Sequence, residues 1–268
     1  MLRTLRKQLA KQPDMFRFEM IAFLSELFDV EVSKATITRA LQSSGMTRKI
    51  IRRVAMQQDT DLHDLFLHKI HLQQVKSYHM TFVDESGSDK REGHRRWGWA
   101  DEDVTPVQRQ EFSRGRRFQV LPAYTQDGIL LSRIYPESTN SAIFEDFIEQ
   151  LIQHCGRFPE PRSALIWDNA SWHRTTRVNE MCAEAGVKNI PSPPYSPRFN
   201  PIEEFFAEFK DYVKKHWYEH LFLIRRDFRA YLRNCIDAAG YDRESARGHF
   251  CHSGYHVYER YERYRNGA

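Results

Sequence analysis

Three acidic residues stand at positions where an α/β protein could use them for chemistry. Asp84 ends the alternating segment SYHMTFV, Asp168 ends the apolar run ALIW, and Glu203 lies in the first turn of an expected helix. Strand ends and helix starts are the places where an α/β sheet presents a site. If the two strands are neighbours, the aspartates converge at one edge of the sheet and Glu203 completes a set of carboxylate ligands.

Carboxylate oxygens are hard ligands that select Mg²⁺ or Mn²⁺ over zinc. Two such ions, about 4 Å apart, can activate a water or a 3′-hydroxyl and stabilise the departing oxygen of a phosphoryl transfer. Asp84, Asp168 and Glu203 together therefore predict a two-metal site for cutting or joining nucleic acid.

Each aspartate taken singly is explained as well by local structure. Asp84 beside Glu85 suits a solvated strand end, and Asp168 followed by Asn169 suits a turn, because both side chains readily cap the backbone. Only the combination of the acids favours a site.

Glu203 also has a structural explanation. The sequence predicts Asn200 as the N-cap of the helix and Pro201 as its first residue. Glutamate three residues after an N-cap is the usual partner in a capping box.

Alternation, apolar stripes and turn signals predict the order of the elements around these acids. Three strands come first, with Gln126-Asp127-Gly128 as the turn between the second and third; then follow a helix from Ser138, a strand ending at Asp168, a helix, a short strand and a long helix. This order matches an RNase H-like α/β fold, a mixed sheet flanked by helices.

The first part of the chain is basic. Residues 1–53 hold eleven Lys or Arg against five acids, although the whole chain of 268 residues carries only +4. A basic arm on a near-neutral body is typical of nucleic-acid enzymes, whose arm neutralises phosphates. A solvated amino-terminal helix explains the charge equally well.

Two helices joined by a tight turn are predicted within this basic region, as a small all-α domain. The first, over 14–28, carries an apolar stripe from Phe16 to Phe28, and the second begins at Ser33 as N-cap and stops at Gly45. The arrangement resembles a helix-turn-helix whose second helix reads DNA, with a plain helical hairpin as the alternative. The candidate DNA contacts on its polar side are Lys34, Thr36, Thr38 and Arg39.

Membrane and secreted classes are not expected. The sequence has no run of 18 apolar residues, and its basic start lacks the apolar stretch of a secretory signal. The four cysteines are widely spaced, which suits a reducing compartment and argues against a zinc knuckle.

Three segments carry a family resemblance. FVDESG, IWDNASWH and YSPRFNPIEEFFAEFK resemble, in order, the catalytic motifs of DDE transposases of the Tc/mariner superfamily and their insertion-sequence relatives. The third is the most specific, because Ser-Pro-x-x-Asn-Pro-Ile-Glu before an aromatic helix is hard to obtain by chance. Between Asp168 and Glu203 lie 34 residues, a spacing characteristic of one branch.

The resemblance implies metal-dependent DNA cleavage followed by strand transfer. It implies a helix-turn-helix region and basic linker over 1–57, an RNase H-like catalytic domain over 75–220, and a C-terminal helical and basic tail over 221–268. Within the catalytic domain, Asp84, Asp168 and Glu203 would hold two Mg²⁺ or Mn²⁺ ions. Asn169 and His173 would support them from the second motif.

The resemblance also implies double-stranded DNA as partner, both the terminal repeats of an element and the target, bound by a homodimer. Arg95, Arg96 and Trp97 would clamp a strand end, and Lys210, two helical turns beyond Glu203, would reach a phosphate. Packed cation–π pairs and a surface lysine are the alternatives. The protein is expected in the nucleus if its source is eukaryotic and otherwise in the cytoplasm.

The sequence departs from the family in two ways. Complete relatives carry two helix-turn-helix units where this chain has room for one, and Arg198 and Phe199 occupy the middle of the third motif. Two other functions therefore stay open: an inactive transposase-derived DNA-binding protein, and an RNase H-like nuclease without strand transfer.

Overall fold

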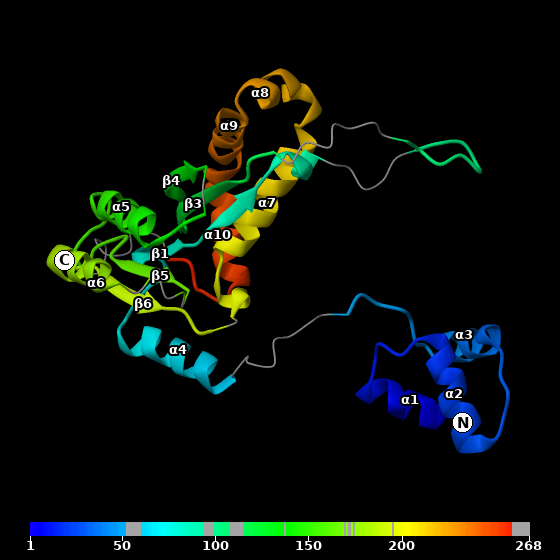
Figure 1. The fold of residues 1–268 in the computed structure, drawn as a ribbon. Helices are drawn as coiled ribbons and strands as arrows, with labels where there is room; N and C mark the ends of the chain where they lie inside the picture. The colour runs from blue at the N-terminus through cyan, green and yellow to red at the C-terminus, as the bar shows by residue number, and fades with distance from the viewer. Residues whose placement is uncertain are drawn as a thin grey trace. The chain divides into compact units, whose positions relative to one another are not determined.

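The chain forms two compact units, Met1–Met56 and Gln57–Ala268 (Figure 1). The computed structural model describes residues 1–51, 60–93, 99–107, 115–136, 138–168, 170, 173, 175–194 and 196–258. Among the helices in these ranges, none is both long and apolar enough to cross a membrane.

Within residues 1–51, the first unit forms three helices, where two were expected. They are α1 (Leu2–Lys11), α2 (Arg17–Phe28) and α3 (Lys34–Ser43). The predicted ends of α3 are confirmed: Ser33 Oγ accepts a hydrogen bond from the backbone N–H of Thr36 at 3.1 Å, and Gly45 has a φ of +79° just past the helix. Glycine suits that left-handed position because it has no Cβ.

The core of the first unit differs from the predicted stripe. Phe16 and Leu27 are 65% and 54% exposed, so much of the expected apolar face of α2 is outside. The part of the stripe that is buried, Met20 and Leu24, packs with the leucines of α1. The buried residues are Leu5, Leu9, Met20, Leu24 and Ile37.

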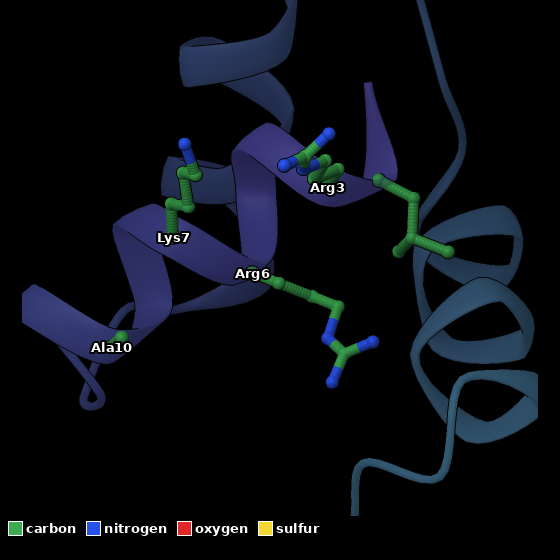
Figure 2. A pocket seen from close by; sticks show the side chains of 5 residues that line it. Arg3, Arg6, Lys7 and Ala10 are labelled. Atoms are coloured by element: carbon green, nitrogen blue, oxygen red, sulfur yellow. The ribbon is translucent and has the colours of Figure 1, made fainter.

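Part of the basic charge predicted over residues 1–53 lies on helix α1. Its ten residues include no acid, and Arg3, Arg6 and Lys7 line a shallow pocket along its surface with Leu2 and Ala10 (Figure 2). Basic side chains therefore lie on the surface of α1, whereas its Leu5 and Leu9 are buried in the core of the unit.

The second unit is built on a six-stranded mixed sheet. Its antiparallel part comprises β1 (Met80–Val83), β2 (Ser86–Ser88), β3 (Phe118–Thr125) and β4 (Gly128–Tyr135). β3 pairs with β4 along one edge and with β1 and β2 along the other. The predicted turn before β4 is confirmed, with Gly128 at a φ of +102°.

β1 and β2 are two pieces of one interrupted strand. Phe82 pairs with Tyr124 and Ser86 with Val120, which is the same register along β3. That register places Pro122 opposite Asp84. Proline has no N–H to donate, and pairing with β3 is interrupted at this position. The backbone at Asp84 lies outside the paired strands.

The parallel part of the sheet follows in the predicted order. β5 pairs in parallel with β1 on one side and with β6 on the other. The helix expected from Ser138 begins later, at Ser141, because Asn140 is its N-cap and accepts from Ile143 N at 3.0 Å. These elements are α5 (Ser141–Ile152), β5 (Ala164–Trp167), α6 (Thr176–Ala185) and β6 (Lys188–Pro191).

Helices flank the sheet (Figure 1), and each face of the sheet has its own core. Val83 and Trp167 pack with α5 and α6, whereas Phe82 and Ile166 pack with α4, α7, α9 and α10. Helix α4, which the sequence patterns did not predict, contributes Phe66 to the second core. The remaining α-helices are α4 (Thr60–Leu72), α7 (Ile202–Lys215), α8 (Leu221–Arg226), α9 (Phe228–Gly240) and α10 (Arg243–His252). Short 3-10 helices span Ser77–His79, Lys90–Gly93, Pro197–Phe199 and Tyr218–His220.

The segment after residue 220 packs into the core of the second unit. Tyr231 and Phe250 are fully buried, and the Tyr255 hydroxyl donates to the carbonyl of Phe199 at 2.7 Å. That bond ties the C-terminal helices to the loop that precedes α7. Residues 259–268 lie outside the described ranges.

Replacing Leu232 by alanine should lower the free energy of unfolding by about 2–5 kcal/mol, because Leu232 is fully buried in the α9 side of the core. Urea unfolding followed by tryptophan fluorescence measures the change. The matched control is its exposed neighbour, Arg233→Ala, which should cost less than about 0.5 kcal/mol. Equal effects of the two substitutions would contradict a core role for α9.

Candidate active site

Strand register brings the two predicted aspartates together. Met80 pairs with Ala164 and Phe82 with Ile166 in the parallel ladder between β1 and β5. Two residues further in the same register, Asp84 lies beside Asp168. Neighbouring strands lie about 4.8 Å apart, so the two side chains leave the same edge of the sheet as neighbours.

Glu203 comes to this edge on α7. Ile202 and Phe205, on either side of Glu203, are fully buried in the core that α7 shares with Phe82 of β1. The charges of Glu203 and Asp168 both act on Asp84. The structure therefore brings the three predicted acids into one electrostatic site.

Asp84 is held by hydrogen bonds to both carboxylate oxygens. Its own neighbour Glu85 donates a backbone N–H to Oδ1 at 2.8 Å, and Asn200 donates its side-chain amide to Oδ2 at 3.0 Å. Sequence reasoning missed the second bond, which joins the third motif to the first.

The predicted start of the long helix is wrong by one residue. α7 begins at Ile202 with Pro201 as its N-cap, and no side chain caps it. Asn200 donates its side-chain amide to Asp84, and its backbone carbonyl, not its side-chain oxygen, accepts from Glu203 N at 3.1 Å. The capping-box explanation of Glu203 fails with it.

Asp168 is held by His173 from within the same motif. Asp168 Oδ1 lies 2.6 Å from His173 Nδ1 and accepts the backbone N–H of Ala170 at 2.9 Å. The His173 side chain is 1% exposed and its ring centroid lies 4.2 Å from that of Phe144. His173 is thus a buried residue in direct contact with Asp168.

Accumulated negative charge is the main electrostatic property of the site. Burial, together with the charges of Glu85, Glu203 and Asp168, raises the pKa of Asp84 to about 7. Burial also raises the pKa of Glu203, and Lys210 partly counteracts that rise. The positive charge of Lys210 therefore offsets only part of the cost of ionising Glu203.

Nearby carboxylates also raise the pKa of His173, but here they act against burial. Burial alone would lower it, but the hydrogen bond to Asp168 and the nearby Glu85 carboxylate outweigh burial and raise the pKa of His173 to about 9. At neutral pH the ring is therefore an imidazolium that binds Asp168 through a charge-assisted hydrogen bond.

The donor set of this site fits divalent magnesium or manganese. Three carboxylates offer only oxygen ligands, and the buried Asn200 Oδ1 has no hydrogen-bond partner among the described residues. In the same ranges, no three His, Cys, Asp or Glu side chains are close enough to hold a metal as they stand. The ligands are therefore brought near one another by the fold but are not clustered at coordination distance.

Some of the other predicted site residues are described by the structure and some are not. Asn169, Arg95, Arg96 and Trp97 lie outside the described ranges. Lys210 is on α7, where its charge acts on Glu203 and Glu92.

The four candidates on α3 divide into two kinds. Lys34 and Arg39 have exposed side chains, whereas Thr36 Oγ1 lies 2.9 Å from Ser33 Oγ and Thr38 Oγ1 donates to the Lys34 carbonyl. The two basic residues are thus the better placed for an external ligand.

A family model described as DDE superfamily endonuclease matches residues 79–221, just over half of the chain. The match includes all three acids. The chain belongs to the DDE superfamily of endonucleases. Comparison with curated proteins gave no match.

Solved structures of Mos1 transposase share the fold. A paired-end complex of Mos1 with the left transposon end is 17% identical with a TM-score of 0.64, covering 90% of this chain and 79% of that one. A mariner Mos1 paired-end complex with Mg is 17% identical with a TM-score of 0.64, and the match covers 96% of this chain and 80% of that one. The Mos1 strand transfer complex is 15% identical with a TM-score of 0.62, and the match covers 96% of this chain and 79% of that one. These matches confirm the predicted RNase H-like sheet flanked by helices and preceded by a helical unit.

Manganese should stabilise this endonuclease against heat, because a divalent cation relieves repulsion among the three carboxylates. At about 100 times its Kd, a ligand of the folded state contributes roughly 2.7 kcal/mol, which raises Tm by several degrees. Differential scanning fluorimetry with Mn²⁺ against EDTA measures the shift.

Asp168→Asn should abolish most of that shift. Asp211→Asn, which removes an exposed acid that pairs with Lys215 further along α7, should leave it intact. A Tm that does not change with Mn²⁺ in the wild type would argue against a metal site.

Proposed function

We propose that this DDE endonuclease is a Tc/mariner transposase that cleaves DNA at the ends of a transposable element and joins the freed 3′ ends to target DNA. The observation that carries the proposal is the in-register placement of Asp84 beside Asp168, with Glu203 arriving on α7. Family membership supplies the reaction class, phosphodiester hydrolysis.

Asp84, Asp168 and Glu203 are the residues that would hold two Mg²⁺ or Mn²⁺ ions. When bound, such ions supply Lewis-acid activation of the attacking and leaving oxygens. The chain's own contribution is orientation: Asn200 restrains Asp84, while His173 and the Ala170 N–H restrain Asp168. Ligands fixed by outer hydrogen bonds lose less freedom when the ions bind.

The similar structures support both the cofactor and the partner. Their names describe Mos1 with a transposon end, a strand transfer complex, and paired-end complexes with Mg and with Mn. By analogy the partner of this chain is double-stranded DNA, bound by a homodimer that pairs two ends. Such a protein works where the chromosome is, in the nucleus of a eukaryote or the cytoplasm of a bacterium.

The first unit supplies the candidate surface for terminal repeats. α3 presents Lys34 and Arg39 to solvent, and α1 adds Arg3, Arg6 and Lys7. Basic side chains on two helices suit a duplex, because phosphate contacts position a helix that reads bases.

Asp168→Asn and Glu203→Gln should each slow metal-dependent cleavage of a duplex carrying the terminal repeats by about a thousand-fold, since each removes a ligand worth several kcal/mol in the transition state. Gel analysis of labelled duplex with Mg²⁺, Mn²⁺ or EDTA measures the rate. The control is Glu204→Gln, which alters the next residue of α7, whose carboxylate faces His252.

A target plasmid in the same reaction separates the alternatives. Cleavage followed by joining supports a transposase, and cleavage that never leads to joining indicates a nuclease. Repeat binding with no cleavage under any metal would make the protein a DNA-binding relic.

Arg39→Ala should weaken binding to the repeat by about 1–3 kcal/mol and make the affinity less dependent on salt, if α3 reads DNA. Fluorescence anisotropy of the full chain at several salt concentrations measures both quantities. Arg233→Ala removes an exposed arginine of α9 and should change neither. The same affinity and salt slope in Arg39→Ala as in the wild type would exclude Arg39 from the interface.

A further inference from the structure

The Glu85 side chain was not among the predicted site residues, yet it stands next to Asp84 in the gap between β1 and β2. Side chains alternate between the faces of a sheet. Asp84 follows Phe82 toward the α7 side, where it meets Asn200. Glu85 follows Val83 toward the opposite side, the core that contains Phe144 of α5.

On that opposite side Glu85 meets His173. Glu85 Oε2 lies 3.6 Å from His173 Nε2, an ion pair rather than a hydrogen bond, and this oxygen is buried without a hydrogen-bond partner among the described residues. The other ring nitrogen, Nδ1, lies 2.6 Å from Asp168. Glu85, His173 and Asp168 thus form a continuous chain of contacts.

The chain links two strands at the level of the site. Glu85 belongs to the segment after β1, whereas Asp168 and His173 follow β5. The ring is confined by burial and by Phe144. The Glu85 oxygen 3.6 Å from Nε2 further limits rotation of the ring about its own bonds.

We propose that Glu85 is a positioning residue that orients His173, so that the Nδ1 of its imidazole keeps Asp168 in place for metal binding. The inference rests on the proposed function, because it needs Asp168 to be a ligand. Partners of this kind typically change metal affinity or activity by about 10–100-fold when removed.

Two other roles for Glu85 make different predictions. As a direct metal ligand, Glu85 would need its carboxylate, so glutamine would fail as badly as alanine. As a source of negative charge only, Glu85 could be replaced by aspartate. For a positioning residue, glutamine keeps both the length and an acceptor oxygen, whereas aspartate keeps the charge but withdraws it by one methylene.

The experiment is a double-mutant cycle on the full chain with Mn²⁺ affinity, from thermal shift, as its first readout. Glu85→Ala and Glu85→Asp should each weaken Mn²⁺ binding by about 10-fold or more, and Glu85→Gln should stay near the wild type. Glu85→Ala combined with His173→Gln should be no worse than His173→Gln alone, because Glu85 acts through His173.

A second readout is made without metal, so that it does not depend on the proposed function. It also separates a loss of positioning from a loss of folding. The imidazole N–H between His173 and Asp168 should give a slowly exchanging, downfield proton signal in EDTA, assigned by its loss in His173→Gln. Glu85→Gln should keep this signal and Glu85→Ala should lose it. The melting temperature of each variant in EDTA reports its folding.

Several results would overturn the inference. Losses that multiply in the double variant would show that Glu85 acts independently of His173. Equal damage by Gln and Ala would make Glu85 a ligand, and tighter Mn²⁺ binding in Glu85→Ala would mean that the contact draws Asp168 away from metal. If the wild type binds Mn²⁺ but never cuts DNA, the proposed function fails while the cycle and the proton signal still decide the role of Glu85.

Discussion

The parallel pairing of β1 with β5 is the constraint on which the rest of the site depends. A slip of one residue would move every side chain of a strand to the other face and separate Asp84 from Asp168. The register is strongly specified because both strands are buried along their whole length and each face packs on a different core. The catalytic geometry is therefore a consequence of hydrophobic packing on two faces, with the acids placed just beyond the last paired residues.

The interruption between β1 and β2 gives adjacent residues two separate tasks. Pairing with β3 stops before Asp84, opposite Pro122, and resumes at Ser86 in the same register. Asp84 is then held from the α7 side by Asn200, and Glu85 lies beside His173 on the α5 side. One break in a strand thus connects the site to both layers of helices.

Much of this arrangement could be predicted from the sequence, since alternation and strand ends located Asp84 and Asp168, and a helix start located Glu203. Asn200 shows the limit: an asparagine before a helix reads as an N-cap, and only the folded structure reveals that its amide is engaged by a residue 116 positions away. The helix α4 was not predicted, and the amino-terminal helix α1 was considered only as an alternative explanation of the basic charge. The packing of Tyr231 and Phe250 under the sheet depends on long-range contacts that no local pattern encodes.

Charge explains why the acids are near one another but not clustered. With Glu85, Glu203 and Asp168 around it, Asp84 is ionised only at a cost, which its raised pKa of about 7 expresses. Drawing the carboxylates closer without a cation would raise that cost further, because repulsion grows as separation falls. Two divalent ions reverse the sign of the interaction. The same acids that repel one another in the free chain then become its ligands, and fixed partners such as His173 and Asn200 limit how far each carboxylate must move.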